Sequence, residues 1–322
     1  MKGVKDNMYF DYVTENKSFV DMANYLKRRG IKNYNFMLTL HDYDLYGVDP
    51  YDPDISFEIR SKVIKESVSN IWYYLREVVR LPAQGGGHRQ YQLNLSNMAQ
   101  VFLFLLNTPS WVTIPRDCSL ETDTLALLSW PQLSDSTMRV GGISLDNTMF
   151  YTKRIKDIIN LLPEYLRDDY YNIQVTPLNF RDSNKTNAIA STLTQDIIWI
   201  TNAEYISNID CVYDASYNAR QYVYRTCGNR NCMLFTSVIS DDNNGQNKIL
   251  GGAMKWEEEY FDGVPIVHWE SSLPLFHIQY SYEQLGKDRA WFKQQSKLLC
   301  NSEDAIRREL LLKRKSDPDK SL

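Results

Sequence analysis

Three short apolar runs constrain the fold of this chain more than any other feature. They are WVTI at 111–114, IIWI at 197–200 and CMLFTSVIS at 232–240. Their apolar residues are consecutive rather than alternating, which is typical of strands buried on both faces of a parallel sheet. Stretches with helical periodicity lie between and around them, at 95–107, 121–130, 152–171 (interrupted at Pro163) and 214–227. This alternation predicts an α/β fold, a mostly parallel sheet with helices on both faces.

The remaining segments predict a three-part organisation. Residues 17–30 and 56–80 have helical spacing, with a break near Asn70, and a loop rich in Asp and Pro at 41–55 separates them. We therefore expect a helical N-terminal subdomain or lid at 1–94, a core at 95–262 and a C-terminal region at 263–322. Further predicted elements are strands at 172–180, 265–272 and 275–282, a loop at 181–192, and helices at 244–262 and 286–315.

Composition narrows the class of protein. The chain has 322 residues, 43% of them hydrophobic and 24% charged, with a formal net charge of −4. These values are ordinary for a water-soluble protein and allow one large core or two domains. No apolar run reaches 18 residues, which predicts no membrane span, and the polar N-terminus predicts a protein that stays in a reducing cytoplasm. The mild acidity argues against a nonspecific nucleic-acid coat protein, but it leaves a local basic face open.

Metal-binding patterns are weak, and we expect no metal site. The five cysteines are scattered, and Cys227 and Cys232 have no histidine at a spacing that would complete a zinc site. The loop at 41–55 has five aspartates but lacks the ligand order of a calcium loop. The three glycines at 85–87 follow no predicted strand and precede no Lys-Thr pair, so they predict a flexible turn.

The stretch WVTIPRDCSLETDTLALLSW at 111–130 combines a strand, a tight turn and a helix. That is the context of a nucleotide-phosphate loop, which needs glycines to bring backbone N–H groups onto the phosphates and a lysine to meet their charge. This turn has neither residue, and it carries Asp117 and Glu121. It has the setting of a phosphate loop without its chemistry.

Several segments in order resemble one family. The run from FEIRSKVIKESVSNIWYYLREVVRLPAQGGG through SWVTIPRD, the segment TKRIKDIINLLPEYL, and IIWITNAEYISNIDCVYDASYNA followed by MLFTSVIS are similar to large terminase subunits of tailed bacteriophages. The resemblance runs from about residue 36 to at least 262. It implies a P-loop NTPase-like fold of the ASCE type, and in that family the domain is an ATPase that drives DNA into the procapsid.

The resemblance also shows where this chain departs from the family. The Walker A pattern P-R-Q-x-x-K-T falls on Pro115, Arg116, Asp117, Cys118, Ser119, Leu120 and Glu121, with Thr122 brought in by a one-residue shift. Leu120 therefore replaces the lysine, and Glu121 replaces the threonine that binds Mg²⁺. The two Walker B carboxylates fall on Thr201 and Asn202, and Glu204 is a displaced candidate, about 6–7 Å further along the strand if the strand continues. The family also has a coupling strand that ends in two threonines, and the resemblance places these positions on Thr236 and Ser237.

Neutral residues cannot hold a metal ion or position the attacking water as carboxylates do. We therefore expect no catalytic residues and no cofactor. ATP and Mg²⁺ would be cofactors only if the protein is an active ATPase with an unconventional site. The family's nuclease domain is also not expected, because only about 60 residues follow 262.

The favoured hypothesis is a non-catalytic interaction or regulatory subunit linked to viral DNA packaging, in the host cytoplasm or associated with the virion. Its candidate partners are an active terminase, the portal protein or the DNA backbone. The alternatives are a structural virion or host-takeover protein that reuses the fold, and an active packaging ATPase with an unconventional site.

Overall fold

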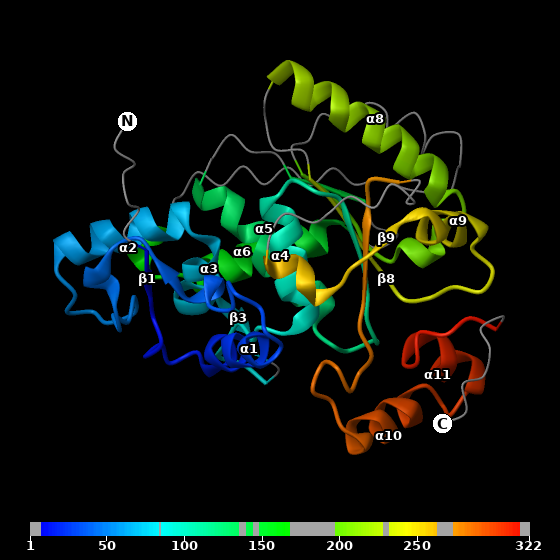
Figure 1. Cartoon of the computed structure of the whole chain (residues 1–322), viewed down its shortest axis with the longest axis horizontal. Coiled ribbons are helices and arrows are strands. Elements are labelled where there is room, and N and C mark those ends of the chain that lie inside the picture. Colours follow the sequence, from blue (N-terminus) through cyan, green and yellow to red (C-terminus); the bar gives the residue numbers. More distant parts are fainter. Residues whose placement is uncertain are drawn as a thin grey trace.

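A six-stranded parallel sheet forms the centre of the molecule (Figure 1). The computed structural model describes residues 8–83, 85–134, 140–143, 148–167, 197–227, 232–262 and 273–315. The strands lie in the order β6-β7-β8-β5-β10-β9, and every neighbouring pair is parallel. Their bounds are β5 (Ser110–Thr113), β6 (Val140–Ile143), β7 (Ile197–Ile200), β8 (Cys232–Ser237), β9 (Met254–Lys255) and β10 (Phe276–Gln279). The predicted parallel sheet is confirmed.

The position of β8 decides the type of sheet. It lies between β5 and β7, with Val112 of β5 opposite Thr236 and Trp199 of β7 opposite Leu234. The strand before the phosphate-loop turn and the Walker B-equivalent strand are thus separated by one additional strand, which is the arrangement of ASCE-type P-loop NTPases. The structure therefore confirms the predicted fold class.

Helices cover both faces of this sheet, as the unbroken apolar strands predict. They are α4 (Leu95–Leu105), α5 (Leu120–Ser134), α6 (Thr148–Asn160), α8 (Ile209–Cys227) and α9 (Asn244–Gly252). Alternate residues of β7 point to opposite faces: Ile198 and Ile200 belong to the apolar cluster with α8 and α9, and Ile197 and Trp199 to the cluster with α4, α5 and α6. Figure 1 shows these two groups of helices on either side of the sheet.

The N-terminal part is largely helical. Its elements are β1 (Tyr9–Phe10), α1 (Lys17–Arg28), η1 (Phe36–Leu38), β2 (Thr39–Leu40), η2 (Tyr43–Leu45), α2 (Phe57–Ser69), α3 (Ile71–Tyr73), the π-helical turn η3 (Tyr74–Val78), β3 (Arg80–Pro82) and β4 (His88–Gln90). The predicted break near Asn70 is confirmed, because the Asn70 side chain accepts hydrogen bonds from the backbone of Trp72 and Tyr73 and so starts a new helix. The predicted glycine turn joins β3 to β4, with Gly85, Gly86 and Gly87 all at positive φ.

An aromatic cluster joins the N-terminal part to the sheet. The ring centroid of Phe36 lies 5.5 Å from that of Phe261, and Phe102 of α4 lies 5.5 Å from Phe261 and 5.8 Å from Trp256. One continuous core cluster accordingly runs from Phe19 to Tyr280. The helical N-terminal part and the sheet share this core.

The structure corrects two helix predictions. Residues 244–262 form α9, the short edge strand β9 and the 3₁₀ turn η6 (Glu258–Asp262), because Gly251 and Gly252 end the helix and Ala253 is extended. The predicted helix at 286–315 is two helices, α10 (Arg289–Leu298) and α11 (Glu303–Glu309), since Cys300 and Asn301 have left-handed backbone conformations that no helix continues through.

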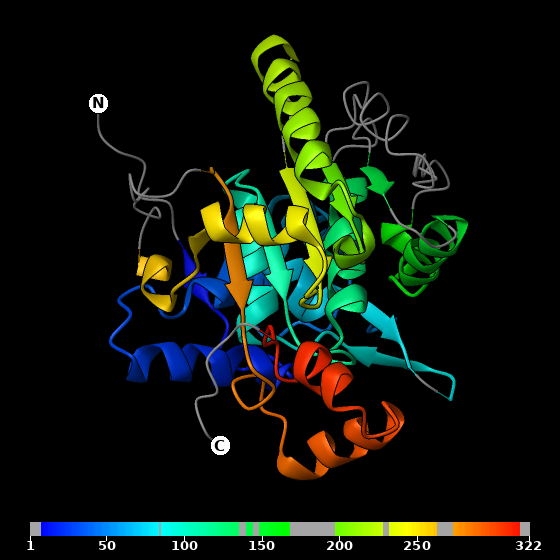
Figure 2. The same cartoon turned by 90° about the vertical axis from the view of Figure 1, so that its right-hand side faces the viewer.

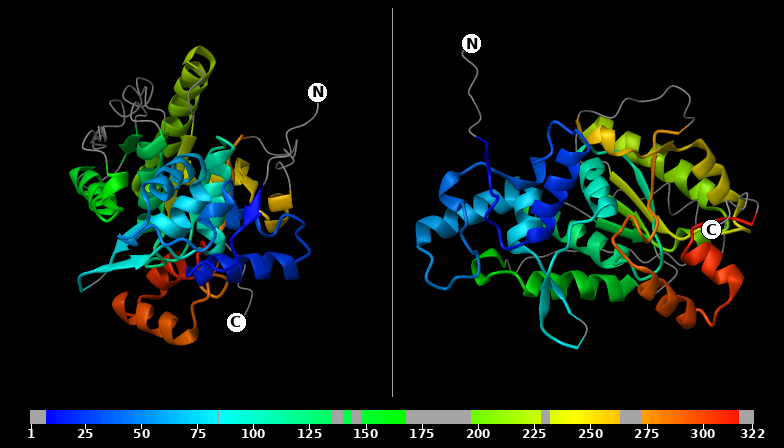
Figure 3. Two further views of the ribbon diagram at one scale, coloured as in Figure 1. Left: turned by 90° about the vertical axis from the view of Figure 1, so that its left-hand side faces the viewer. Right: turned by 60° about the horizontal axis from the view of Figure 1, so that its bottom comes forward.

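The C-terminal region contributes to the central sheet as well. β10 pairs with β5 in parallel, so a strand that follows residue 262 lies beside the phosphate-loop strand. From there the chain continues to α10 and α11, which lie beyond the carboxyl ends of the strands (Figure 2). Figure 3 shows the same two helices apart from the N-terminal part.

Some predicted elements lie in parts of the chain that the structure does not describe. The strand at 172–180, the loop at 181–192 and the strand at 265–272 lie outside the described residues. Within the part of the chain that is described, no helix combines the length and apolarity needed to cross a membrane.

Candidate functional site

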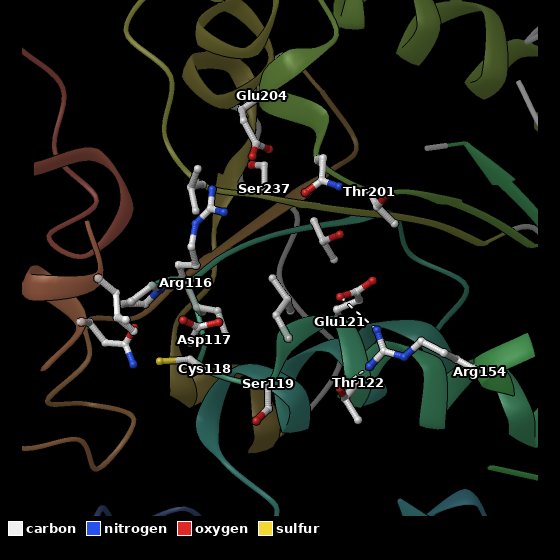
Figure 4. A pocket seen from close by; sticks show the side chains of 18 of the residues that line it. Arg116, Asp117, Cys118, Ser119, Glu121, Thr122, Arg154, Thr201, Glu204 and Ser237 are labelled. Atoms are coloured by element: carbon white, nitrogen blue, oxygen red, sulfur yellow. Dashed lines mark hydrogen bonds and ion pairs between the residues drawn. The ribbon is translucent and has the colours of Figure 1, made fainter. Parts of the chain in front are cut away.

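A cavity of about 920 Å³ opens at the carboxyl ends of β5, β7 and β8. In a parallel α/β sheet this edge is where ligands bind, because the loops that leave the strands converge there. The twelve site residues expected from the sequence all line it: Pro115, Arg116, Asp117, Ser119, Leu120, Glu121, Thr122, Thr201, Asn202, Glu204, Thr236 and Ser237. Residues more than 120 positions apart in the chain thus meet in one site (Figure 4).

The turn between β5 and α5 bends through two left-handed residues. Asp117 and Ser119 have φ values of +62° and +65°, and Cys118 lies between them. The Cys118 N–H donates to the Pro115 carbonyl at 3.3 Å, which closes the turn. The loop therefore keeps its bend with no glycine in it, at a cost of about 1 kcal/mol or more for each left-handed residue.

The side chains at the start of α5 have a different chemistry from a phosphate site. Leu120 opens the helix, and Glu121 follows it in the first turn. The Glu121 carboxylate forms an ion pair with Arg154 of α6 at 3.2 Å, and the Arg154 guanidinium also donates to the Thr122 hydroxyl at 2.9 Å. Figure 4 shows Arg154 reaching both residues from the neighbouring helix. The position where a phosphate group would meet the helix N-terminus is occupied by a carboxylate and its own counter-ion.

Arg116 in the turn is bound by the last residue of α11, Glu309. Its Nε lies 2.7 Å from a carboxylate oxygen of Glu309, and its backbone N–H donates to the Glu309 carbonyl at 3.0 Å. Burial has the largest single effect and opposes the charged form, but Glu309, Tyr205 and Glu204 together outweigh it and raise the pKa of Arg116. The arginine of this turn is therefore already paired within the chain.

The strand β7 ends before Thr201 and Asn202, the residues that the sequence resemblance aligns with the Walker B carboxylates. It stops at Ile200, Asn202 has a φ of +49°, and Glu204 lies in the 3₁₀ turn η5 (Ala203–Tyr205). The expectation that Glu204 lies further along a continuing strand is wrong, because the left-handed Asn202 turns the chain. Glu204 instead faces the cavity (Figure 4).

Glu204 is a buried carboxyl in this setting. Its exposed fraction is 7%, and burial raises its pKa to about 7. Among the described residues, one Glu204 carboxylate oxygen and the Thr201 hydroxyl have no hydrogen-bond partner. Both atoms are buried, although their residues line the cavity.

The hydroxyls at the end of β8 serve the packing of the sheet. The Thr236 hydroxyl accepts a hydrogen bond from the Trp199 indole at 3.2 Å, and the Ser237 hydroxyl accepts one from the Trp111 indole at 2.7 Å. The side-chain amide of Gln246 also donates to Ser237. These bonds hold β5, β7, β8 and α9 in register around the cavity.

Comparison with known proteins gives the following result. No family model matches the chain, and no curated protein matches its sequence. Among solved structures it is similar to the large terminase ATPase domain of Thermus phage P74-26. For a single-residue variant of that domain the TM-score is 0.46 at 12% identity, and the match covers 70% of this chain and 95% of that chain. A second structure of that domain gives a TM-score of 0.44 at 10% identity, covering 69% and 94%.

A third similar structure is the large terminase of the thermophilic bacteriophage D6E in complex with ADP. Its TM-score is 0.41 at 6% identity, and the match covers 68% of this chain and 53% of that one. All three are phage large terminases. That is the family which the sequence motifs resemble.

Sequence reasoning missed the part of the cavity that comes from other segments. Arg89 of β4, Arg154 of α6 and Gln294, Gln295 and Leu298 of α10 also line it. Nothing local distinguishes Arg154 from the other basic residues of its helix, and the approach of α10 depends on the path of the whole C-terminal region. Only tertiary structure could reveal these residues.

Basic and acidic residues around the cavity are equal in number. The lining includes three arginines, Arg89, Arg116 and Arg154, and three carboxylic acids, Asp117, Glu121 and Glu204. Within the described part of the chain, no three His, Cys, Asp or Glu side chains are grouped so that they could hold a metal ion. The cavity is therefore polar, and it has only a small excess of positive charge for a triphosphate, because burial raises the pKa of Glu204 to about 7.

Proposed function

We propose that this protein is a non-catalytic relative of phage large terminase ATPase domains that acts as an interaction or regulatory subunit in viral DNA packaging. The observation that carries the proposal is the state of the phosphate-loop turn. Its backbone bend is present, yet Leu120 and Glu121 stand at the lysine and threonine positions, and Glu121 is paired with Arg154.

Binding of Mg-ATP is unfavourable at such a turn. A triphosphate carries several negative charges, and at this turn it would meet Glu121 at the helix N-terminus and Asp117 in the loop. Arg116 and Arg154 would have to leave Glu309 and Glu121 to compensate for that charge. Like charges in a partly buried site repel each other strongly because water screens them poorly.

Turnover would also lack its catalytic groups. Phosphoryl transfer depends almost entirely on positioning and on neutralising charge, by a lysine, a metal ion and a residue that orients the attacking water. Thr201 and Asn202 are neutral, and Glu204 carries a pKa near 7 and lies in a turn beyond the strand end. Each lost electrostatic contact typically costs about 3–4 kcal/mol of transition-state stabilisation, so the combined loss should abolish hydrolysis.

The link to DNA packaging comes from the order and spacing of the sequence segments that resemble the family. A chain that keeps this fold and loses the ATP cycle can still occupy a place in an assembly. The proposed partners are an active large terminase, the portal protein or the DNA backbone, and the proposed location is the host cytoplasm during assembly.

One observation favours a second candidate, an ATPase with an unconventional site. Glu204 brings a buried carboxyl into the cavity with one oxygen unpaired among the described residues, and Arg154 brings a cation near the start of α5. In this candidate Glu204 would position water and an arginine would replace the lysine. Any ATP hydrolysis that is lost in Glu204→Gln but kept in Glu257→Gln would support it.

Affinity capture from infected cells tests the proposal. The tagged chain should recover the phage's active large terminase or its portal protein, at a level above that recovered by an unrelated tagged phage protein. Recovery of only host proteins, or of capsid and tail proteins, would contradict the packaging role and favour the structural or host-takeover alternative.

A further inference from the structure

The N-terminal part exposes a group of aromatic rings that we call the tyrosine surface, formed by Tyr9, Val13, Tyr43 and Tyr46. Val13, Tyr43 and Tyr46 are exposed by 50%, 58% and 38%. The Tyr43 ring centroid lies 5.2 Å from that of Tyr9 and 5.6 Å from that of Tyr46, with which it is stacked. Apolar groups gathered in this way on a surface are typical of sites where another molecule packs.

The segment that carries Tyr43 and Tyr46 is acidic. Residues 41–58 include six carboxylic acids and no lysine or arginine: Asp42, Asp44, Asp49, Asp52, Asp54 and Glu58. The ammonium of Lys62 contacts Asp44, lies 3.5 Å from Asp42 and lies 3.6 Å from Glu58. Further along the segment, the Arg60 guanidinium donates to the Pro53 carbonyl, between Asp52 and Asp54. One lysine among three carboxylates leaves an excess of negative charge beside the rings. It also shows that these carboxylates converge on a lysine ammonium.

Several cations of the N-terminal part stack on tyrosine rings. Lys27 lies 5.3 Å from the Tyr34 ring centroid, and Arg80 lies 4.5 Å from that of Tyr51. Three further pairs of this kind are Arg29 with Tyr25, Arg60 with Tyr165 and Arg76 with Tyr73. Among the described residues, no lysine or arginine is stacked on Tyr43 or Tyr46. Two exposed rings in an acidic setting thus have room for a cation from outside the chain.

We propose that the tyrosine surface is a docking site for a lysine- or arginine-rich segment of a partner protein. Such a segment would place its cations over Tyr43 and Tyr46 and pair with the neighbouring carboxylates, while its side-chain methylenes cover Val13. Nucleic acid is not the ligand, because its phosphates would meet the acidic residues. The surface belongs to the end of the molecule away from α10 and α11, so the inference is independent of the cavity and of its proposed loss of catalysis (Figures 1 and 3).

Octa-arginine is a suitable probe, titrated by fluorescence anisotropy into the full chain at low salt. Tyr43→Ala with Tyr46→Ala should weaken binding about fivefold or more, because two ring contacts are lost. Tyr43→Phe with Tyr46→Phe keeps both rings and should stay within about twofold of wild type. Thermal unfolding of each variant checks that the exposed substitutions leave the fold intact.

A matched pair of variants separates this surface from general charge attraction. Asp44→Asn with Glu58→Gln should weaken binding, whereas Glu257→Gln with Glu259→Gln removes the same charge elsewhere and should change affinity little. Hydrogen exchange of the wild-type protein with the peptide should be slowed at 41–58. The proposal is overturned by no binding, by equal affinity of the Tyr→Ala variant, by protection only at other segments, or by binding of a DNA duplex at this surface. Self-association that is lost in the Tyr→Ala variant would also overturn it, in favour of a second copy of this chain.

Discussion

At the scale of single residues, the turn between β5 and α5 has a tight backbone bend but lacks the side chains of a phosphate-binding loop. Asp117 and Ser119 adopt left-handed conformations that glycine would adopt more readily. The sequence shows that this turn has no lysine and no glycine, but it does not predict that two non-glycine residues adopt left-handed conformations there. Strain of this kind depends on the surrounding structure, which holds the turn between β5 and α5.

Asp123 gives a prediction about pH at the same scale. It is buried in the first turn of α5, accepts a hydrogen bond from the Asn97 side chain at 3.0 Å, and has its pKa raised by burial to about 7. The folded chain therefore binds this proton more tightly than the unfolded chain, in which an aspartate has a pKa of about 3.9. The stability that the protonated carboxyl contributes is present below about pH 4 and is lost as the pH rises to about 7.

Asp123→Asn should remove this dependence. An asparagine can still accept the hydrogen bond and never ionises, so the variant should be more stable than wild type at pH 8 by about 2–4 kcal/mol. Urea unfolding from pH 4 to pH 8 measures the difference. The exposed Asp242→Asn is the control and should follow wild type. An Asp123→Asn curve parallel to that of wild type would mean that this carboxyl does not titrate on unfolding.

At the scale of elements, the apolar runs predict the central strands and the helices between them because burial on both faces leaves a clear pattern. The ends of the chain are less predictable. The helix expected at 286–315 is two helices because the left-handed Cys300 and Asn301 interrupt it, and an amphipathic pattern does not report such a break. The approach of α10 to the cavity likewise depends on contacts distant in sequence.

The docking of α11 yields the element-scale prediction. Arg307 donates to both carboxylate oxygens of Asp241, at 3.0 and 2.7 Å, and this bonding lowers the pKa of Asp241 to about 2. The lowered pKa means that the interaction stabilises the fold above about pH 4, the unfolded value, and is lost as the pH falls through about 2. Arg307→Gln should therefore loosen α11 more at neutral pH than at pH 2, where only bonds such as that of Arg307 to the Lys313 carbonyl are lost.

Hydrogen exchange of peptides spanning 303–315 measures this loosening. Exchange should be about fivefold faster in Arg307→Gln at pH 7, as expected for the loss of a partly exposed bidentate pair. Arg308→Gln on the same helix is the matched control and should exchange like wild type. Equal rates in both variants would show that other contacts hold α11 in place.

At the scale of the whole molecule, the N-terminal part and the sheet are joined through the aromatic cluster of Phe36, Phe102, Trp256 and Phe261. Phe261 is 2% exposed and contacts rings from both parts. Phe261→Ala should lower the free energy of unfolding by about 3–5 kcal/mol, since it leaves a cavity between them. Phe57→Ala, at a side chain 86% exposed, should change it by no more than about 0.5 kcal/mol. Guanidinium unfolding tests both variants, and a small effect of Phe261→Ala would mean that the two parts do not depend on this contact.

The central claim is that the cavity at the carboxyl ends of the strands does not bind a nucleotide. Calorimetric titration of Mg-ATP into the purified chain, extended well above a millimolar nucleotide concentration and paired with a phosphate-release assay, tests this directly. The account predicts no binding heat above dilution and no hydrolysis. Micromolar binding would contradict it, and Arg116→Ala and Glu204→Gln would then be the first variants to measure.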